Sequence, residues 1–324
     1  MKLFELYARK KKDMQMVERE LERAIRSDHL MLNETSLHLL KAGGKRLRPV
    51  FVLLAGEFGN NDLNALTRVA VSLELIHMAS LVHDDVIDDT DTRRGQSTVK
   101  SKWDNRIAMY TGDYIFAKAL TVIAELNDPR LHQILSKAMV QMSLGEMEQI
   151  RLFFHTGQTI RDYLLRTRRK TALLIAVSCQ LGAMAAQADD AVCRSLYAYG
   201  YNTGMAFQIR DDILDLCGTE EELGKPPGSD IRQGNITLPV LYSLRNPLVR
   251  ERLLAEIEAI RKADGDREIG EFLRLVREGG GIRLAEQLSD RYITKAIRAL
   301  DALPDSASRR NLADIARFVG RRNY

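Results

Sequence analysis

Two acidic clusters of identical spacing, each reading D-D-x-x-D, stand out in this chain. They comprise Asp84, Asp85 and Asp88 in the first, and Asp211, Asp212 and Asp215 in the second. In a helix, carboxylates four positions apart project from the same face. Crowded carboxylates repel one another, and burying them without a counter-charge is very unfavourable. Carboxylate oxygens suit Mg²⁺, which commonly binds through a few of them together with substrate phosphates. The clusters therefore predict a magnesium-diphosphate site.

The residues that precede the two clusters argue against their lying on ordinary solvated surface helices. A single D-D-x-x-D run is more often a solvated helix surface than a metal ligand set. Here, however, the motif occurs twice, and apolar residues precede it at 75–82 and at 204–209. Solvated helices are not apolar on nearly every side. The repeated motif in apolar surroundings favours metal binding.

Basic and polar residues that suit an anionic ligand lie near the first cluster. A turn reading Gly-Gly-Lys-Arg-Leu-Arg-Pro contains Lys45 and Arg48, and its glycines let backbone N–H groups approach an anion. His77 lies two helical turns before the cluster, while Arg93 and Arg94 follow it. Taken alone, each has an ordinary alternative: a basic connecting loop, a core histidine or a surface pair. Their order along one chain is what points to diphosphate.

The composition is that of an ordinary globular protein. Of 324 residues, 45% are hydrophobic and 28% charged, and the net charge of +4 is mild. Basic residues form several separate islands rather than one stripe, so no nucleic-acid partner is expected. Three cysteines without a C-x-x-C spacing predict neither a disulfide framework nor a zinc site. No signal-peptide pattern and no run of eighteen apolar residues occurs, so we expect a cytoplasmic protein without stable membrane insertion.

The pattern of apolar residues predicts an all-α fold. No alternation of β-branched residues persists, and long stretches contain at most one proline. We expect loops at 91–95 and 219–235 and a single domain over 1–324. The predicted helices cover about 3–40 with a break near Ser27, 50–58, 63–90, 107–126, 129–154, 159–187, 190–217, 237–245, 249–263, 267–278, 282–302 and 306–320.

Together these residues resemble the trans-polyprenyl diphosphate synthases. Besides the two clusters, the pattern includes Gly43 to Pro49, His77, Arg93-Arg94, Gly112-Asp113, Gly145-Glu146-x-x-Gln149, Lys170-Thr171 and Phe207-Gln208. It runs in order from about residue 40 to 245. Within the family, residues 234–239 resemble the larger, catalytic subunits of two-component bacterial enzymes. Asn235 stands where many relatives have lysine, so no phosphate contact is expected from it.

The resemblance implies a fold and a role for each residue. The fold is the isoprenoid synthase type, a single large all-α helical bundle with a central cavity. Mg²⁺ would be held by Asp84, Asp88 and Asp211, with Asp85, Asp212 and Asp215 acting through water or as supporting groups. The allylic diphosphate would be bound by Arg93, Lys170 and Lys225. Isopentenyl diphosphate would be bound by Lys45, Arg48, His77 and Arg94. The allylic cation would be sheltered by Thr171 and Gln208.

The size of the product follows from the residues just before the first cluster. Ala79 and Ser80 are small, whereas short-chain relatives typically carry aromatic rings there. One helical turn is about 5.4 Å, close to one isoprene unit, so a prenyl tail could extend past Ile76. The resemblance implies an all-trans product of about C30–C35, such as a menaquinone side chain requires.

Two other interpretations remain open at this stage. Geranylgeranyl or other-length synthases share the same motifs, and class I terpene cyclases also use D-D-x-x-D. Cyclases generally pair it with a differently spaced second motif and lack the Gly-Gly-Lys loop, because they bind one diphosphate. A non-catalytic prenyl-binding subunit would have damaged aspartates, and all six are intact here. The resemblance also implies a dimer, either a homodimer or a heterodimer with a small regulatory subunit.

Overall fold

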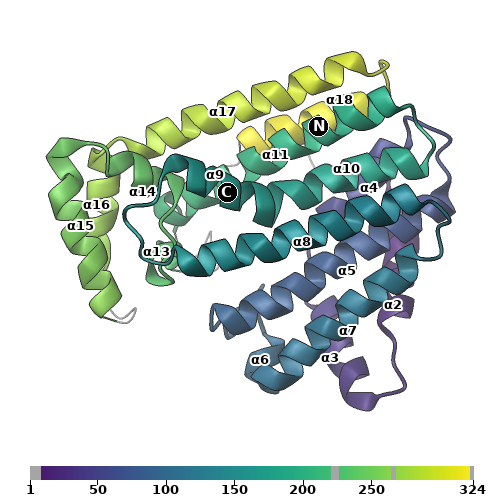
Figure 1. The fold of residues 1–324 in the computed structure, drawn as a ribbon, viewed down its shortest axis with the longest axis horizontal. Coiled ribbons are helices and arrows are strands. Elements are labelled where there is room, and N and C mark those ends of the chain that lie inside the picture. The colour runs from purple at the N-terminus through teal and green to yellow at the C-terminus, as the bar shows by residue number, and fades with distance from the viewer. Residues whose placement is uncertain (1–8, 220–225, 264–267, 322–324) are drawn as a thin grey trace. The chain divides into compact units, whose positions relative to one another are not determined.

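The chain is almost entirely helical, as the sequence predicts (Figure 1). The computed structural model describes residues 9–219, 226–263 and 268–321. The first helices are α2 (Lys11–Ile25), α3 (Leu30–Lys41), α4 (Leu47–Gly56), α5 (Leu63–Ile87), α6 (Val99–Lys102), α7 (Asn105–Ile123), α8 (Pro129–Arg151), α9 (Ile160–Thr167), α10 (Leu173–Ala185) and α11 (Asp190–Cys217). After them come α13 (Ser229–Arg232), α14 (Leu238–Ser243), α15 (Pro247–Lys262), α16 (Gly270–Glu278), α17 (Gly281–Ala299) and α18 (Ala307–Gly320).

Residue contacts divide the chain into two compact units. The first comprises residues 1–135, 177–197 and 302–312, and the second comprises 136–176, 198–301 and 313–324. The first acidic cluster belongs to the first unit and the second cluster to the second unit. The single domain expected from the sequence stays a prediction.

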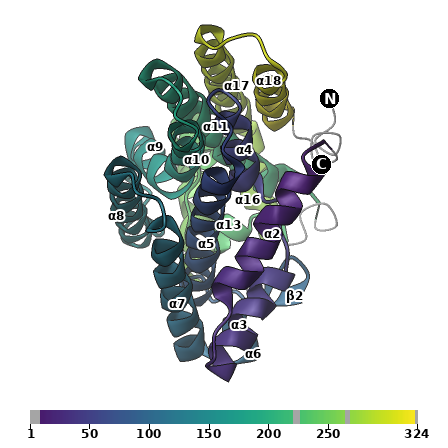
Figure 2. The same ribbon diagram turned by 90° about the vertical axis from the view of Figure 1, so that its right-hand side faces the viewer.

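Helix α5 forms the core of the first unit. The Asp62 side chain caps its start by accepting from the backbone N–H groups of Asn64 and Ala65. Every residue from 69 to 76 is buried, and α5 packs along α7 and against α4. Helices α2 and α3 also contact α7 (Figure 2). Among the described residues only α5 is long and apolar enough to cross a membrane, but 72% of its most apolar stretch is buried inside the structure.

A short hairpin replaces the loop expected at 91–95. Strand β1 (Thr92–Arg93) pairs antiparallel with β2 (Gln96–Ser97). Both residues of the connecting turn have positive φ, 54° at Arg94 and 74° at Gly95. Two-residue hairpin turns favour positive φ because it matches the twist of the flanking strands, and glycine adopts it without steric cost. The predicted loop is thus a hairpin turn at Arg94 and Gly95, and the prediction missed that residues 92 and 93 pair with 96 and 97.

The helix expected at 159–187 contains a local change of winding. A π-helical turn at Arg168–Ala172 separates α9 from α10, and the Leu173 N–H donates to the Arg168 carbonyl. Such single turns of wider winding occur frequently at functional sites. Lys170 and Thr171 both lie in this turn. Apolar periodicity alone could not predict it, because the flanking helices continue on either side.

The core of the second unit is built by the C-terminal helices. Residues from α11, α14, α15 and α16 form one buried apolar cluster that includes Ile213, Leu241, Leu253 and Phe272. Helix α14 contacts both α16 and α17. The predicted loop at 219–235 contains the one-turn helix α13 in its described part. The three cysteines are free, as the sequence predicts.

Candidate functional site

The first acidic cluster lies at the C-terminal end of α5. Asp84 and Asp88 are half-buried, and Asp88 caps the helix by donating its N–H to the Asp84 carbonyl at 2.8 Å. Asp85 is buried, and its Oδ1 accepts from Nε of Arg93 at 2.7 Å. Burial raises the pKa of Asp85, while Arg93 opposes the shift. The guanidinium thus holds Asp85, while Asp84 and Asp88 project from one accessible helix face.

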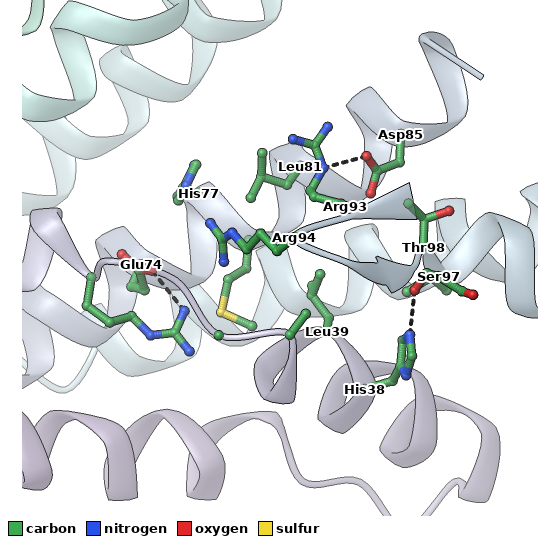
Figure 3. Close-up of a pocket in the computed structure, with 15 residues that line it drawn as sticks. His38, Leu39, Glu74, His77, Leu81, Asp85, Arg93, Arg94, Ser97 and Thr98 are labelled. Carbon is green, nitrogen blue, oxygen red and sulfur yellow. Dashed lines mark hydrogen bonds and ion pairs between the residues drawn. The ribbon is translucent and has the colours of Figure 1, made fainter. Parts of the chain in front are cut away.

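The hairpin that carries Arg93 and Arg94 is fastened on both sides. The Thr98 hydroxyl donates to the Thr90 carbonyl at 2.8 Å, just after the first cluster. From α3, the His38 ring nitrogen Nε2 lies 2.7 Å from the Ser97 carbonyl oxygen (Figure 3). Because the turn is already fixed, its side chains lose less conformational entropy when a ligand binds.

A pocket of the first unit opens beside this hairpin (Figure 3). Its polar lining residues are His38, Arg46, Glu74, His77, Asp85, Arg93, Arg94, Ser97 and Thr98. The Arg94 side chain extends toward His77 and Glu74 (Figure 3). Gly44 makes this approach possible, because a Cβ there would lie 2.4 Å from Nη1 of Arg94. The glycine therefore lets an arginine lie directly on the backbone of the Gly-Gly-Lys loop.

Arg46, which sequence reasoning passed over, secures this loop. It is buried with a left-handed φ of 44°. Its guanidinium donates to Glu18 of α2 at 2.8 Å, to Glu74 of α5 at 3.1 Å and to the Leu40 carbonyl of α3 at 3.2 Å. Because these bonds satisfy its charge, Arg46 is a clamp rather than a ligand. It fixes the turn on which Lys45 lies exposed.

Two arginines, Arg48 and Arg94, lie close together at the pocket, and Glu74 offsets the charge of each only in part. Burial lowers the pKa of Arg48 to about 10, with nearby Arg94 also lowering it, so Arg48 stays charged at neutral pH. Its buried Nε makes no hydrogen bond within the described structure. Burial, followed by Arg46, lowers the pKa of Arg94. Burial and then Arg48 and Arg94 lower the pKa of His77 well below its usual range, which keeps the imidazole neutral. A half-buried arginine with an unpaired Nε, next to an exposed arginine, favours an anionic ligand.

The two small residues one turn before the first cluster, Ala79 and Ser80, differ in exposure. Ala79 has no exposed surface, whereas Ser80 is half-buried and donates its hydroxyl to the His77 carbonyl at 2.9 Å. Ser80 lies four positions before Asp84 and shares its helix face. A ligand beside this turn of α5 could therefore contact Ser80, whereas Ala79 belongs to the packed core.

In the second unit, Asp212 is the centre of a buried hydrogen-bond chain. Its Oδ2 accepts from the Tyr163 hydroxyl at 2.6 Å, and its Oδ1 accepts from the Gln208 amide at 2.9 Å. The Gln208 carbonyl oxygen in turn accepts from the Thr171 hydroxyl at 2.7 Å. Burial, followed by Asp230, raises the pKa of Asp212 to about 8, and the two hydrogen bonds counteract that rise. Burial raises the pKa of Tyr163 further above its usual range, so the phenol remains a donor.

The other two aspartates of this cluster differ in exposure. Asp211 is half-buried, while Asp215 is 2% exposed. Asp215 accepts from the Asp230 N–H at 3.3 Å, and its own carbonyl accepts from the Gly228 N–H at 2.7 Å. Asp215 therefore anchors the segment that follows α11. Asp211 is the more accessible carboxylate of the cluster, and the direct metal role expected for it stays a prediction.

Lys170 and Thr171 are presented by the π-helical turn. Lys170 donates to Glu146 of α8 at 2.8 Å, and both side chains are about a quarter exposed. An ion pair this exposed typically contributes about 0–1 kcal/mol, so a diphosphate can displace it. Two glycines allow α8 and α11 to pack closely against this turn. A Cβ on Gly145 of α8 would lie 2.8 Å from the Cβ of Arg169, and one on Gly204 of α11 would lie 2.6 Å from the Ala172 Cα.

Substitution of Gly204 is expected to disturb this turn. Its added methyl group would meet backbone atoms of Ala172, which cannot rotate away. Gly204→Ala should lower the free energy of unfolding by about 1–3 kcal/mol. It should also weaken binding of the allylic substrate, because Lys170 and Thr171 move with the turn. Chemical denaturation and steady-state kinetics measure both effects. Gly270→Ala, where a Cβ meets nothing within 4 Å, is the control.

Most of the residues that the sequence singles out lie in two groups, one in each unit. The structure brings Arg48, His77, Arg93 and Arg94 to the first cluster's side of the first unit, and Thr171, Gln208 and Asp212 into one chain in the second. Lys225 lies outside the described residues. Tyr163 and Arg46 were missed: Arg46 stands inside the Gly-Gly-Lys motif, which is a signal, but no sequence pattern marks Tyr163.

The donor set fits Mg²⁺ better than a metal fully enclosed by protein. Among the described residues, no group of three or more His, Cys, Asp or Glu side chains is arranged to hold a metal. Each cluster instead presents accessible carboxylates, Asp84 with Asp88 in one unit and Asp211 in the other. Mg²⁺ typically binds in this way, keeping waters and substrate phosphate oxygens in the remaining positions.

Comparison with known proteins agrees with these features. Residues 29–276 match the family model described as polyprenyl synthetase. Heptaprenyl diphosphate synthase component 2 of Geobacillus stearothermophilus is 53% identical over 324 residues, covering all of both chains. The crystal structure of heptaprenyl diphosphate synthase from Staphylococcus aureus is 41% identical, with a TM-score of 0.90 over 97% of this chain and 98% of that one. The fold is thus the all-α isoprenoid synthase fold.

A third relative is relevant to the ligands. Polyprenyl synthase from Caulobacter crescentus CB15, solved in complex with calcium and isoprenyl diphosphate, is 31% identical, with a TM-score of 0.89 over 99% of this chain and 98% of that one. The match to the family model covers most of the chain, and the first relative matches it from end to end. The chain therefore belongs to the polyprenyl synthetase family.

Proposed function

We propose that this chain is the catalytic component of a heptaprenyl diphosphate synthase. It extends an allylic diphosphate, such as farnesyl diphosphate, by head-to-tail condensation with isopentenyl diphosphate and releases pyrophosphate. The C35 all-trans product would supply a menaquinone side chain in the cytoplasm. The observation that carries the proposal is Arg48, whose buried Nε has no hydrogen-bond partner in the described structure, together with Arg94 and neutral His77. A second diphosphate site of this kind distinguishes elongation from cyclisation.

The residues divide the chemistry between two head groups. Asp84, Asp88 and Asp211 would hold Mg²⁺, which neutralises charge on the departing pyrophosphate. Lys170 and Arg93, released from Glu146 and Asp85, would bind the same allylic head group. The allylic C1–O bond then breaks, with the electron pair leaving on pyrophosphate. Lys45, Arg48, Arg94 and the His77 ring would hold isopentenyl diphosphate so that its double bond lies against that carbon.

The remaining steps need no further group. The double bond of isopentenyl diphosphate forms the new C–C bond to C1, which moves the positive charge onto the added unit. Loss of one proton from this unit restores a double bond. The pyrophosphate just released is the base we propose. Thr171 and Gln208 lie in a mutual hydrogen bond, and their oxygens would shelter the cation during these steps.

A two-substrate assay tests the proposal. Pyrophosphate release is followed with farnesyl diphosphate alone, with isopentenyl diphosphate alone and with both, and mass spectrometry identifies the prenyl products. Release that requires both substrates, with a C35 product, is the expected result. Release from the allylic substrate alone would point to a cyclase, and a C20 product would point to a geranylgeranyl synthase.

Chain length should respond to a ring placed on the accessible face of α5. Ser80→Phe fills space one turn below Asp84, which a growing tail would occupy at about 5.4 Å per isoprene unit. We expect products shortened to about C15–C20 while the first condensation proceeds. Ala79→Phe would instead overpack the core, at about 1–3 kcal/mol. Asn64→Phe adds the same ring at the exposed start of α5 and should leave the product unchanged; an unaltered C35 product from Ser80→Phe would place the tail elsewhere.

A second polypeptide is the partner we propose, since the relative from Geobacillus stearothermophilus is named as one component of a synthase. Helix α8 carries four exposed apolar side chains, Val140, Leu144, Met147 and Ile150. Their spacing places the first three on one face. Contiguous exposed apolar residues of this kind typically mark protein contacts.

Charge placed on that face should prevent assembly. The double substitution Leu144→Lys with Met147→Lys is expected to abolish association of this chain with its partner polypeptide, or with itself, in sedimentation velocity. Leu248→Lys, at a more exposed apolar site on α15, is the control and should assemble normally. Unchanged sedimentation of the double variant would mean that association uses another surface.

A further inference from the structure

Tyr163 is a buried polar residue that the proposed chemistry does not use. It lies on α9, is 1% exposed, and its ring packs in the apolar cluster that contains Ile209 and Ile213 of α11. Its hydroxyl, the polar atom of the side chain, donates to Oδ2 of Asp212 at 2.6 Å. Placing a phenol rather than a phenyl ring in a packed core gains nothing in apolar burial. The hydroxyl therefore has a purpose at Asp212.

Asp212 is held from both sides. The Gln208 amide donates to its Oδ1 at 2.9 Å, opposite the tyrosine on Oδ2. An ionised carboxylate only accepts hydrogen bonds, so one donor on each oxygen fixes both its rotamer and its plane. Both hydrogen bonds favour the ionised form of Asp212 against the burial that raises its pKa, and neither donor brings a charge that would neutralise the carboxylate. Such a carboxylate can still attract the Mg²⁺ ion that a diphosphate carries.

The position of the phenol is itself set by its surroundings. The guanidinium of Arg166 lies 5.7 Å from the Tyr163 ring centre and is fixed by Gln158 at 3.3 Å and the Ile236 carbonyl at 3.1 Å. The start of α9 is fixed by a capping box in which Thr159 and Asp162 bond to each other's backbone N–H. Tyr163 is thus a rigid donor rather than an adaptable one.

We propose that Tyr163 is a positioning residue of the second acidic cluster, holding Asp212 so that the cluster takes up the Mg²⁺-bound diphosphate. The inference rests on the proposed function and assigns it one more residue. Tyr163 touches no reacting atom and acts through Asp212 alone. Removing the hydroxyl should therefore weaken metal and allylic-substrate binding, and leave isopentenyl diphosphate binding unchanged.

The test compares Tyr163→Phe with Tyr199→Phe. Tyr199 is also fully buried, lies on α11 about three and a half turns before Asp212, and controls for loss of a buried hydroxyl. For Tyr163→Phe we expect the Mg²⁺ concentration at half-maximal rate and the KM for farnesyl diphosphate to rise about tenfold, the size typical of groups that support metal ligands. The KM for isopentenyl diphosphate should stay within about twofold. Tyr199→Phe should change none of these.

A binding measurement separates positioning from simple stability. The rise in melting temperature caused by Mg²⁺ with pyrophosphate is measured for each variant against its own melting temperature without them. Tyr163→Phe should lose most of this rise, while Tyr199→Phe keeps it. A lower melting temperature with an undiminished rise, and unchanged metal dependence, would show a structural role only and overturn the inference. If Tyr163→Phe does not fold, Gln208→Met removes the opposite donor and the same rise is measured.

A double substitution tests whether the effect passes through Asp212. In an Asp212→Asn background, adding Tyr163→Phe should produce no further loss in Mg²⁺ dependence, because the charge that the phenol positions is gone. Independent, additive losses would contradict the inference. A different result would contradict the proposed function itself. If that function is wrong, the wild-type chain with its partner releases no pyrophosphate from the two substrates, and this outcome does not depend on the Tyr163 variants.

Discussion

Replacing Asp84 or Asp211 with alanine is expected to lower turnover at least about a thousandfold, which corresponds to about 4 kcal/mol of transition-state stabilisation. Asp84 and Asp211 are the accessible carboxylates of their clusters, whereas Asp85 and Asp212 are already held by Arg93 and Tyr163. An accessible carboxylate whose charge is not needed for folding is the one that a metal can use. Its loss removes the electrostatic support for the departing pyrophosphate.

Stability should change little in these variants, because removing one member of an acidic cluster relieves repulsion. Steady-state turnover and thermal unfolding are measured together, and excess Mg²⁺ should not restore the rate. Asp91→Ala removes a nearby exposed aspartate and should keep near-normal turnover. Turnover within about tenfold of wild type in either cluster variant would contradict metal binding by both clusters.

The second large effect is the separation of the two head-group sites. Arg94→Ala is expected to raise the KM for isopentenyl diphosphate about 10- to 150-fold, the range for losing a charged hydrogen bond. Arg94 has no ion-pair partner within the described structure and lies beside the neutral His77. The substitution therefore removes a ligand and leaves no carboxylate of the pocket unpaired.

Lys170→Ala should act on the other substrate. We expect a similar rise in KM for farnesyl diphosphate with little change for isopentenyl diphosphate, because Lys170 belongs to the π-helical turn beside Thr171. The matched controls are Lys102→Ala for the first unit and Arg151→Ala for the second, both exposed cations. Equal changes for both substrates in either variant would mean that the division of residues between the two sites is wrong.

Much of the architecture was determined by the sequence. Apolar periodicity and the scarcity of proline predicted an all-α chain, and the helices containing both acidic clusters were placed within a few residues of their observed ends. Spacing also placed Asp84 with Asp88 on one face of α5, because a helix returns to the same side about every four residues. These properties are local, so the order of residues is enough to determine them.

Local exceptions to the predicted pattern needed three-dimensional contacts. The hairpin that carries Arg93 and Arg94 depends on a left-handed arginine and on the contact between His38 and the Ser97 carbonyl. The π-helical turn that presents Lys170 is possible because Gly204 admits α11 beside it. Neither feature has a period or a composition that sequence reasoning can detect.

The roles within each cluster were decided only by tertiary structure. Three aspartates of a D-D-x-x-D motif are chemically identical in sequence. Yet Asp85 is held by Arg93, Asp212 by Tyr163 and Gln208, and Asp215 is buried, while Asp84, Asp88 and Asp211 remain accessible. Tyr163 is distant from Asp212 in sequence, and no motif connects them. Hydrogen bonds between distant residues depend on how helices pack, and packing is a property of the whole unit. The sequence thus determined which chemistry is present, and the tertiary structure decided which side chains are available to perform it.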